Sequence, residues 1–152
     1  MATESDALIA TVELLSAGWV QANTSSIRPR FWRNINQPVG GFNYAMGDPV
    51  HILVYPVSHT NVPNGLGANY RDATVDRVSI DIRCKYLSPE DTWDLGRKCY
   101  NELRRIVSGS VVNNPITGFQ QLLRDEPVQD FSTAGFFRYV TDWSLRNFNV
   151  ER

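Results

Sequence analysis

The clearest pattern in the chain is a strict alternation of apolar and polar residues that begins near residue 75. The apolar or aromatic positions are Val78, Ile80, Ile82, Cys84 and Tyr86. The polar positions between them are Ser79, Asp81, Arg83 and Lys85. Alternation of this length predicts a strand with one face in a core and the other in water.

A helix is predicted directly after this strand. Ser88 is a preferred N-cap residue, Pro89 suits the first helical position, and Glu90 and Asp91 favour the positive end of the helix dipole. Gly109 supplies a stop. The apolar stripe at helical spacing is Trp93, Gly96, Tyr100, Leu103, Ile106 and Val107. We expect this helix to lie across the sheet. The expected contacts join Trp93, Tyr100 and Leu103 to Ile80, Ile82 and Tyr139 or their neighbours.

The other patterns predict a second helix and four more strands. The helix covers residues 5–18, and the strands cover 27–34, 50–57, 119–125 and 135–149. Pro29 favours an edge position or a strand start. The last two strands are expected to form an antiparallel hairpin joined near residues 129–134.

Two connecting segments stand out. Residues 35–49 hold three glycines and two prolines and predict a loop or a wide hairpin connection. Residues 58–72 predict a loop longer than the roughly 12 residues at which unstructured connections become unusual, and we expect it to be mobile in the free protein. The order α-β-β-β-α-β-β predicts one α+β domain over residues 1–152. It consists of a mostly antiparallel sheet of about five strands with two helices packed on it.

Composition narrows the function classes. A net charge of −1 and a pI near 6.1 give no electrostatic case for nucleic acid or for an anionic membrane. No apolar run approaches the roughly 20 residues of a membrane span, and the acidic start of the chain is unlike a signal peptide, so we expect an intracellular origin and no membrane partner. Cys84 and Cys99 are expected to be buried reduced thiols, with a disulfide left open as the alternative.

The residues offer no catalytic, cofactor-binding or metal-ligating set, and we expect no cofactor and no enzymatic activity. His51 is interpreted as a surface or strand-end residue and His59 as a solvated loop histidine. Arg28, Arg30 and Arg33 form a small basic set with Phe31 and Trp32 between them, as on a nucleic-acid surface, but the overall charge argues against that interpretation.

Aromatic residues suggest a protein interface instead. Phe136, Val140 and Phe148 interrupt the otherwise polar parity of the last predicted strand. We expect a neighbouring subunit to bury them, and acids on that subunit to pair with Arg138 and Arg146.

The chain resembles a known family in its element order, in the S-P-E helix start at Ser88–Glu90 and in the residue pattern of 75–107 and 137–145. This family comprises the tail-terminator proteins of long-tailed bacteriophages and related viruses, also called minor tail or tail-completion proteins. The resemblance covers nearly the whole chain and rests on layout rather than on a signature motif. Head-closure and neck proteins of the same viruses are similar in size and fold and remain an alternative.

The resemblance implies a structural virion protein of the tail and neck region. It implies a ring, usually a homohexamer, that caps the tail tube, stops its polymerisation and offers the surface that joins the head. The implied partners are the protein itself, the tail tube protein and a head-completion or neck protein, with DNA passing through the lumen without sequence-specific binding. Loop 58–72 is then expected to order on a partner through Asn61, Asn64, Asn69 and Tyr70.

Two competing hypotheses stay open. A small α+β enzyme or ligand-binding domain would use the loops at 40–48 and 58–72 as a pocket. A neck adaptor would touch DNA in its lumen through Arg28, Arg30 and Arg33.

Overall fold

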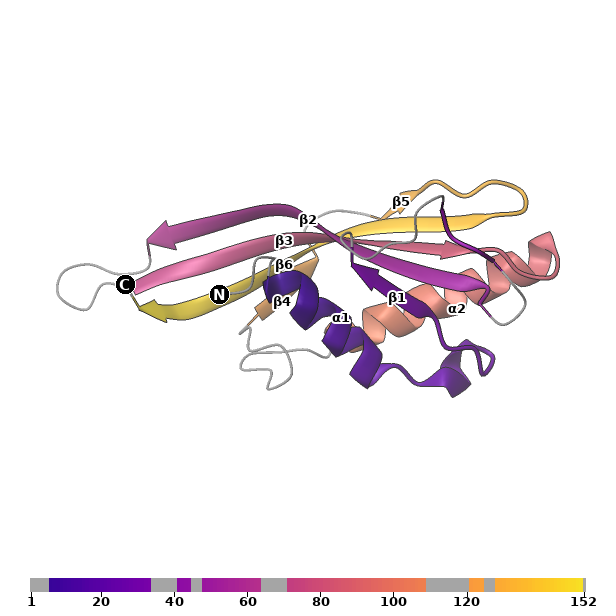
Figure 1. Cartoon of the computed structure of the whole chain (residues 1–152), viewed down its shortest axis with the longest axis horizontal. Helices are drawn as coiled ribbons and strands as arrows, with labels where there is room; N and C mark the ends of the chain where they lie inside the picture. The colour runs from indigo at the N-terminus through magenta and orange to yellow at the C-terminus, as the bar shows by residue number, and fades with distance from the viewer. Residues whose placement is uncertain are drawn as a thin grey trace.

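The computed structural model describes residues 6–33, 41–44, 48–63, 71–108, 121–124 and 128–151. Two α-helices and a mostly antiparallel sheet form the fold in the order α-β-β-β-α-β-β, which confirms the predicted α+β class (Figure 1). The elements are α1 (Asp6–Gly18), β1 (Arg30–Arg33), β2 (Val50–Pro63), β3 (Arg71–Cys84), α2 (Pro89–Ser108), β4 (Gln121–Arg124) and β6 (Phe137–Glu151). A 3-10 helix η1 (Gln21–Thr24) and a two-residue strand β5 (Gln129–Asp130) add to this order.

The strands lie in the order β1-β2-β3-β6-β4, and β5 pairs with β6. β1 starts directly after Pro29 and forms one edge of the sheet, as predicted. β1 and β2 are parallel, so the chain between them must run back along the sheet, and a wide hairpin over residues 35–49 is wrong. β4 and β6 are antiparallel, as expected.

β2 and β3 are longer than the sequence predicted. β2 continues to Pro63 and β3 begins at Arg71, so residues 58–63 and 71–72 belong to strands and not to a mobile loop. A register shift between Pro56 and Ser58 lets β2 pass the proline without losing its pairing with β3. Residues 64–70 lie outside the described residues.

The core lies between the sheet and both helices. Tyr139 of β6 meets two side chains of α2 edge-on, at ring-centroid distances of 6.1 Å to Trp93 and 5.2 Å to Tyr100. Leu103 is fully buried among the core residues. The Ser88 hydroxyl accepts a hydrogen bond from the Asp91 amide at 3.1 Å, so the predicted N-cap is present. The expected helix-on-sheet packing is confirmed.

Both cysteines are buried and reduced, as predicted. Burial raises the pKa of the Cys84 thiol to about 12 and raises that of Cys99 as well. Neither thiol is therefore ionised near neutral pH, and neither is a nucleophile there.

Candidate functional site

The sheet face opposite the helices carries most of the described residues that the sequence suggested for partner contact. The pairing register places Asp81 of β3 between Leu53 of β2 and Val140 of β6. Two residues further along β3, Arg83 lies between His51 of β2 and Arg138 of β6. This outer face therefore combines apolar, charged and aromatic side chains within two adjacent rows.

Asp81 binds two arginines of this face, Arg83 and Arg138. It is fully buried, and its Oδ2 accepts hydrogen bonds from Nη2 of Arg83 at 3.0 Å and from Nη2 of Arg138 at 2.9 Å. Nε of Arg138 also donates to Oδ1 of Asp81, at 3.2 Å. These hydrogen bonds raise the pKa of Arg138. Arg138 was expected to pair with an acid on another subunit; its carboxylate partner is instead Asp81 of its own chain.

Aromatic side chains from the β1–β2 crossover cover part of this face. Phe42 stacks on His51 at a centroid distance of 4.9 Å, and Tyr44 meets the same ring edge-on at 5.0 Å. Tyr44 also contacts the half-buried Phe136 at 5.7 Å. Val140 is only 6% exposed in the single chain. The expectation that a neighbouring subunit must bury Val140 is therefore wrong.

His51 is the second residue of β2, so its interpretation as a strand-end residue is confirmed, but it is buried and its interpretation as a surface histidine is wrong. Nε1 of Trp32 donates to Nδ1 of His51 at 3.0 Å, so the ring proton lies on Nε2, which donates to the Asn43 carbonyl at 2.9 Å. Burial lowers the pKa of His51. Both ring nitrogens are engaged, which leaves neither free to bind a metal.

His59 lies in β2 and not in a loop, so this part of its interpretation is wrong. Its side chain is 61% exposed, and its Nδ1 lies 2.5 Å from Oδ1 of the buried Asp76. The basic residues near β1 also have partners within the chain. Arg28 donates to the Ser16 carbonyl at 2.6 Å, and Arg30 pairs with Asp48 at 3.4 Å.

The other predicted contact residues are described only in part. Asn61 lies in β2 opposite Thr74, and Arg146 lies in β6 opposite Val75. Phe148 lies in β6. Asn64, Asn69 and Tyr70 fall outside the described residues. Their roles in partner contact remain predictions.

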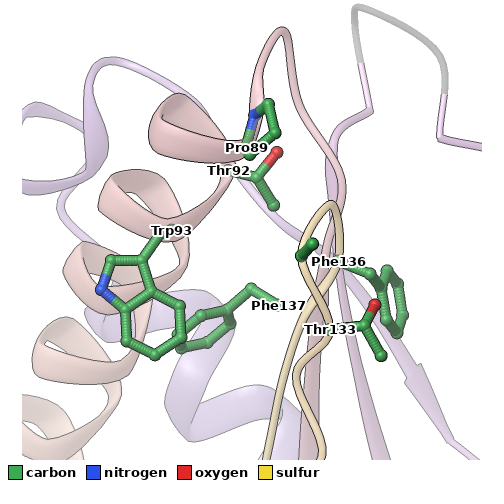
Figure 2. Close-up of a pocket in the computed structure, with 7 residues that line it drawn as sticks. Pro89, Thr92, Trp93, Thr133, Phe136 and Phe137 are labelled. Atoms are coloured by element: carbon green, nitrogen blue, oxygen red, sulfur yellow. The ribbon is translucent and has the colours of Figure 1, made fainter.

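A pocket that the sequence did not predict opens between the first turn of α2 and the turn that joins β5 to β6 (Figure 2). Its volume is about 210 Å³, and its lining residues are Pro89, Thr92, Trp93, Thr133, Ala134, Phe136 and Phe137. It is smaller than the roughly 300–1,000 Å³ of small-molecule sites. None of its lining residues belongs to the loops at 40–48 and 58–72, where a ligand pocket was hypothesised, although Tyr44 of the first loop contacts the lining Phe136. Only the pairing of β6 with β3 brings its two walls together, so local sequence gives no signal for it.

The edge of β2 is a second feature of interest. Among the described pairings, β1 covers β2 only from His51 to Val54. Residues 55–63 of β2 therefore have no described strand on their outer side. Backbone groups on such an edge are a template for pairing with another chain.

Within the described ranges, no group of three or more His, Cys, Asp or Glu residues could hold a metal ion. Neither described α-helix is long and apolar enough to cross a membrane.

Comparison with known proteins gives a structural match. No protein-family model matches the sequence, and no curated protein shows detectable sequence similarity to it. Among solved structures, the chain is similar to one from the virion of a native gene transfer agent particle, with a TM-score of 0.55 at 11% identity. The match covers 91% of this chain and 92% of that chain. At 11% identity, this match shows that the two chains share a fold.

Proposed function

We propose that this protein is a structural component of a phage-like virion. The fold match to a chain of a gene transfer agent virion supports this proposal, because it spans nearly the whole of both chains. The lack of a described metal cluster and the closed hydrogen bonding of His51 agree with a role in assembly. In this proposal the protein turns over no substrate and binds no cofactor.

Within the virion, we propose the role of tail terminator. The protein would form a ring, with six copies as the expected number, on the last ring of the tail tube. There it would stop tube polymerisation and present the surface that receives the head. Its partners would be other copies of itself, the tail tube protein and a head-completion or neck protein, with DNA passing through the lumen.

The open edge of β2 supports a ring. A cyclic ring requires a heterologous interface, in which one patch of a subunit meets a different patch on the next copy. The outer side of residues 55–63 is one such patch, since among the described pairings no strand covers it. On the opposite edge of the sheet, the described pairing of β4 with β6 ends at Arg146, which leaves residues 147–151 for a second patch. Pairing between these two edges would continue the sheet from copy to copy.

The decisive experiment removes the protein from virion assembly. Particles made without it should carry tails of uncontrolled length, whether or not these join heads. Tails of normal length that stay unattached would favour the neck adaptor role. Normal, head-attached tails would exclude both roles. Electron microscopy of the purified protein provides a second test, in which rings with a central hole are expected.

A further inference from the structure

Two arginines lie directly opposite each other on the outer face of the sheet. The register of β3 and β6 pairs Arg83 with Arg138, and both donate hydrogen bonds to the fully buried Asp81. We propose that this arginine pair binds a second carboxylate, which an acidic segment of a partner protein supplies. The inference concerns the single chain and does not depend on the proposed ring.

Each guanidinium uses only one of its two hydrogen-bonding edges on Asp81. Nε and Nη2 of Arg83 donate to Oδ2 of Asp81 at 3.2 and 3.0 Å. Nε and Nη2 of Arg138 donate to Oδ1 and Oδ2 at 3.2 and 2.9 Å. Among the described residues, no hydrogen bond involves Nη1 of either arginine. The Nη1–Nη2 edge of both guanidiniums is therefore left for another acceptor, and this edge is a fork that matches a carboxylate.

The arginine pair carries more positive charge than Asp81 compensates. Like charges directly opposite each other destabilise a sheet, and here two of them share one carboxylate. Tyr44 lies close enough for both arginines to act on its phenol, but burial raises the pKa of Tyr44 to about 12. Tyr44 is therefore neutral near neutral pH and supplies no second negative charge. Lys85, which follows the end of β3, is exposed and adds positive charge to this region.

Other described carboxylates of this region are engaged elsewhere. Asp48 and Asp142 each form an ion pair with a different arginine, at 3.4 and 3.8 Å. Oδ1 of Asp130 accepts a hydrogen bond from the Ser132 amide at 2.8 Å, and the charge of Asp130 acts on Tyr139 of the helix-covered face. Within the described part of the chain, the arginine pair therefore has Asp81 as its counter-ion and no second one.

Aromatic rings hold both guanidiniums in place. Cζ of Arg83 lies 5.2 Å from the centre of the Phe42 ring, and Cζ of Arg138 lies 5.3 Å from the centre of the Phe131 ring. The two arginine side chains are still 27% and 33% exposed, so a ligand has access to them. Stacked and ion-paired arginines are preorganised, so that binding costs little side-chain entropy.

Charge and surroundings favour a carboxylate on a protein over the phosphates of a nucleic acid. The pair has one positive charge in excess of Asp81, which a single carboxylate neutralises. Nucleic-acid binding instead requires a basic surface that follows many phosphates, and this chain has a net charge of −1. Phe131 is 52% exposed beside Arg138, and arginine together with exposed aromatic residues is typical of protein interfaces.

Peptide titration followed by NMR tests the site. The probes are acetyl-Leu-Glu-Leu-amide and its uncharged isostere acetyl-Leu-Gln-Leu-amide, added at matched ionic strength to the full-length, ¹⁵N-labelled protein. The Nε–H signals of Arg83 and Arg138 should shift with the glutamate peptide, and the glutamine peptide should bind at least about five-fold more weakly. Equal binding of the two peptides, or no shift from either at millimolar concentrations, would overturn the proposal.

Arginine substitutions along one strand provide the control. Arg83→Gln should weaken binding of the glutamate peptide about ten-fold, and Arg83→Lys, which keeps the charge but lacks the fork, should weaken it as well. Arg77→Gln removes a guanidinium from the same face of β3, where it is paired with Asp142, and should leave the affinity unchanged. An equal loss in Arg77→Gln, or full affinity in Arg83→Lys, would overturn the proposal. Thermal melts confirm that each variant is folded.

A short DNA duplex is the third probe. Tighter binding of the duplex than of the glutamate peptide at the same Nε–H signals would assign the arginine pair to phosphate and overturn the proposal. The titrations are also independent of the assembly experiment. Peptide binding by a protein whose loss leaves normal tails would keep the carboxylate site and overturn the terminator role. Tail termination by a protein that binds neither peptide would keep that role and overturn the site.

Discussion

The ring of Phe137 occupies the space that a side chain at Gly96 would need. A Cβ atom on Gly96 would lie 2.2 Å from Cγ of Phe137. Gly96→Ala should therefore destabilise the protein by about 1–3 kcal/mol through overpacking, even though alanine favours a helix by about 1 kcal/mol over glycine. Urea unfolding would measure the change. Gly135→Ala is the control and should be close to neutral, because no described atom lies within 4 Å of its Cβ position. A stabilised Gly96→Ala variant would contradict the close approach of α2 to β6.

The burial of Asp81 predicts which of two substitutions destabilises the protein more. Asp81→Ala should cost about 3–5 kcal/mol, because it leaves the guanidiniums of Arg83 and Arg138 without their shared carboxylate. Arg138→Ala should cost less, since Asp81 keeps its hydrogen bonds to Arg83 and the removed side chain is about one third exposed. Denaturant unfolding of the two variants tests the order. A larger loss of stability in Arg138→Ala than in Asp81→Ala would contradict this order and would mean that Arg138 makes stabilising contacts other than those with Asp81.

Glu102 should make the stability depend on acid pH. Hydrogen bonds from Arg105, from the Val20 amide and from Asn23 lower the pKa of Glu102 to about 2, against a cost of burial that acts in the opposite direction. A lowered folded-state pKa contributes stability above the unfolded value near 4.3, and this contribution is lost as the pH falls towards 2. Glu102→Gln should cost about 1–3 kcal/mol at pH 7 and flatten this part of the pH profile. Glu13→Gln, which alters an exposed carboxylate, should leave the profile intact.

His51 should add a second pH dependence at a higher range. Burial lowers its pKa, so the unfolded chain binds a proton more readily than the folded one. The resulting stability is fully present above about pH 6.5 and is lost as the pH falls through the folded pKa. Unfolding measured from pH 7.5 to pH 5 should show this loss, and His51→Gln should reduce the slope. His59→Gln serves as the comparison, and an equal reduction by that variant would contradict the assignment to His51.

Leu103 provides a direct test of the helix-on-sheet core. Leu103→Ala removes a fully buried side chain and should cost about 2–5 kcal/mol. Leu87→Ala removes the same group from a position that is 61% exposed and should change the free energy of unfolding by less than about 0.5 kcal/mol. A thermal melt in which both variants behave alike would contradict the packing of α2.

Local patterns were enough to predict the centre of the fold. The alternation over residues 78–86 and the cap at Ser88 each depend on neighbouring residues only. β3 covers the alternation as far as Cys84, and the cap is present as expected. The prediction failed for β2 beyond Val57, because proline and asparagine usually interrupt strands. Pairing along the full length of β3 outweighs that local preference, and the register shift next to Pro56 accommodates the proline.

The outer face was predicted less well, for a different reason. Strand parity correctly separates Arg138 and Val140 from the helix-covered side, but it does not say what covers the opposite side. The crossover places Phe42 and Tyr44 on that side, and Asp81 of β3 pairs with Arg138. The chain itself therefore makes some of the contacts that had been predicted for a neighbouring subunit. The pocket beside Trp93 was missed because its walls are more than 30 residues apart in the sequence.

The pairing of β3 with β6 also determines when the protein can fold during synthesis. Cys84 pairs with Phe137 and Arg71 with Glu151, so the two central strands are 53 to 80 residues apart in the chain. The β2–β3 hairpin leaves the ribosome first and carries an uncovered edge until the final strand emerges. Non-local pairing of this kind is typical of slow-folding domains, and an unpaired edge promotes aggregation. Slower translation of the segment between α2 and β6 should therefore lower the yield of soluble protein, because it prolongs the exposure of that edge.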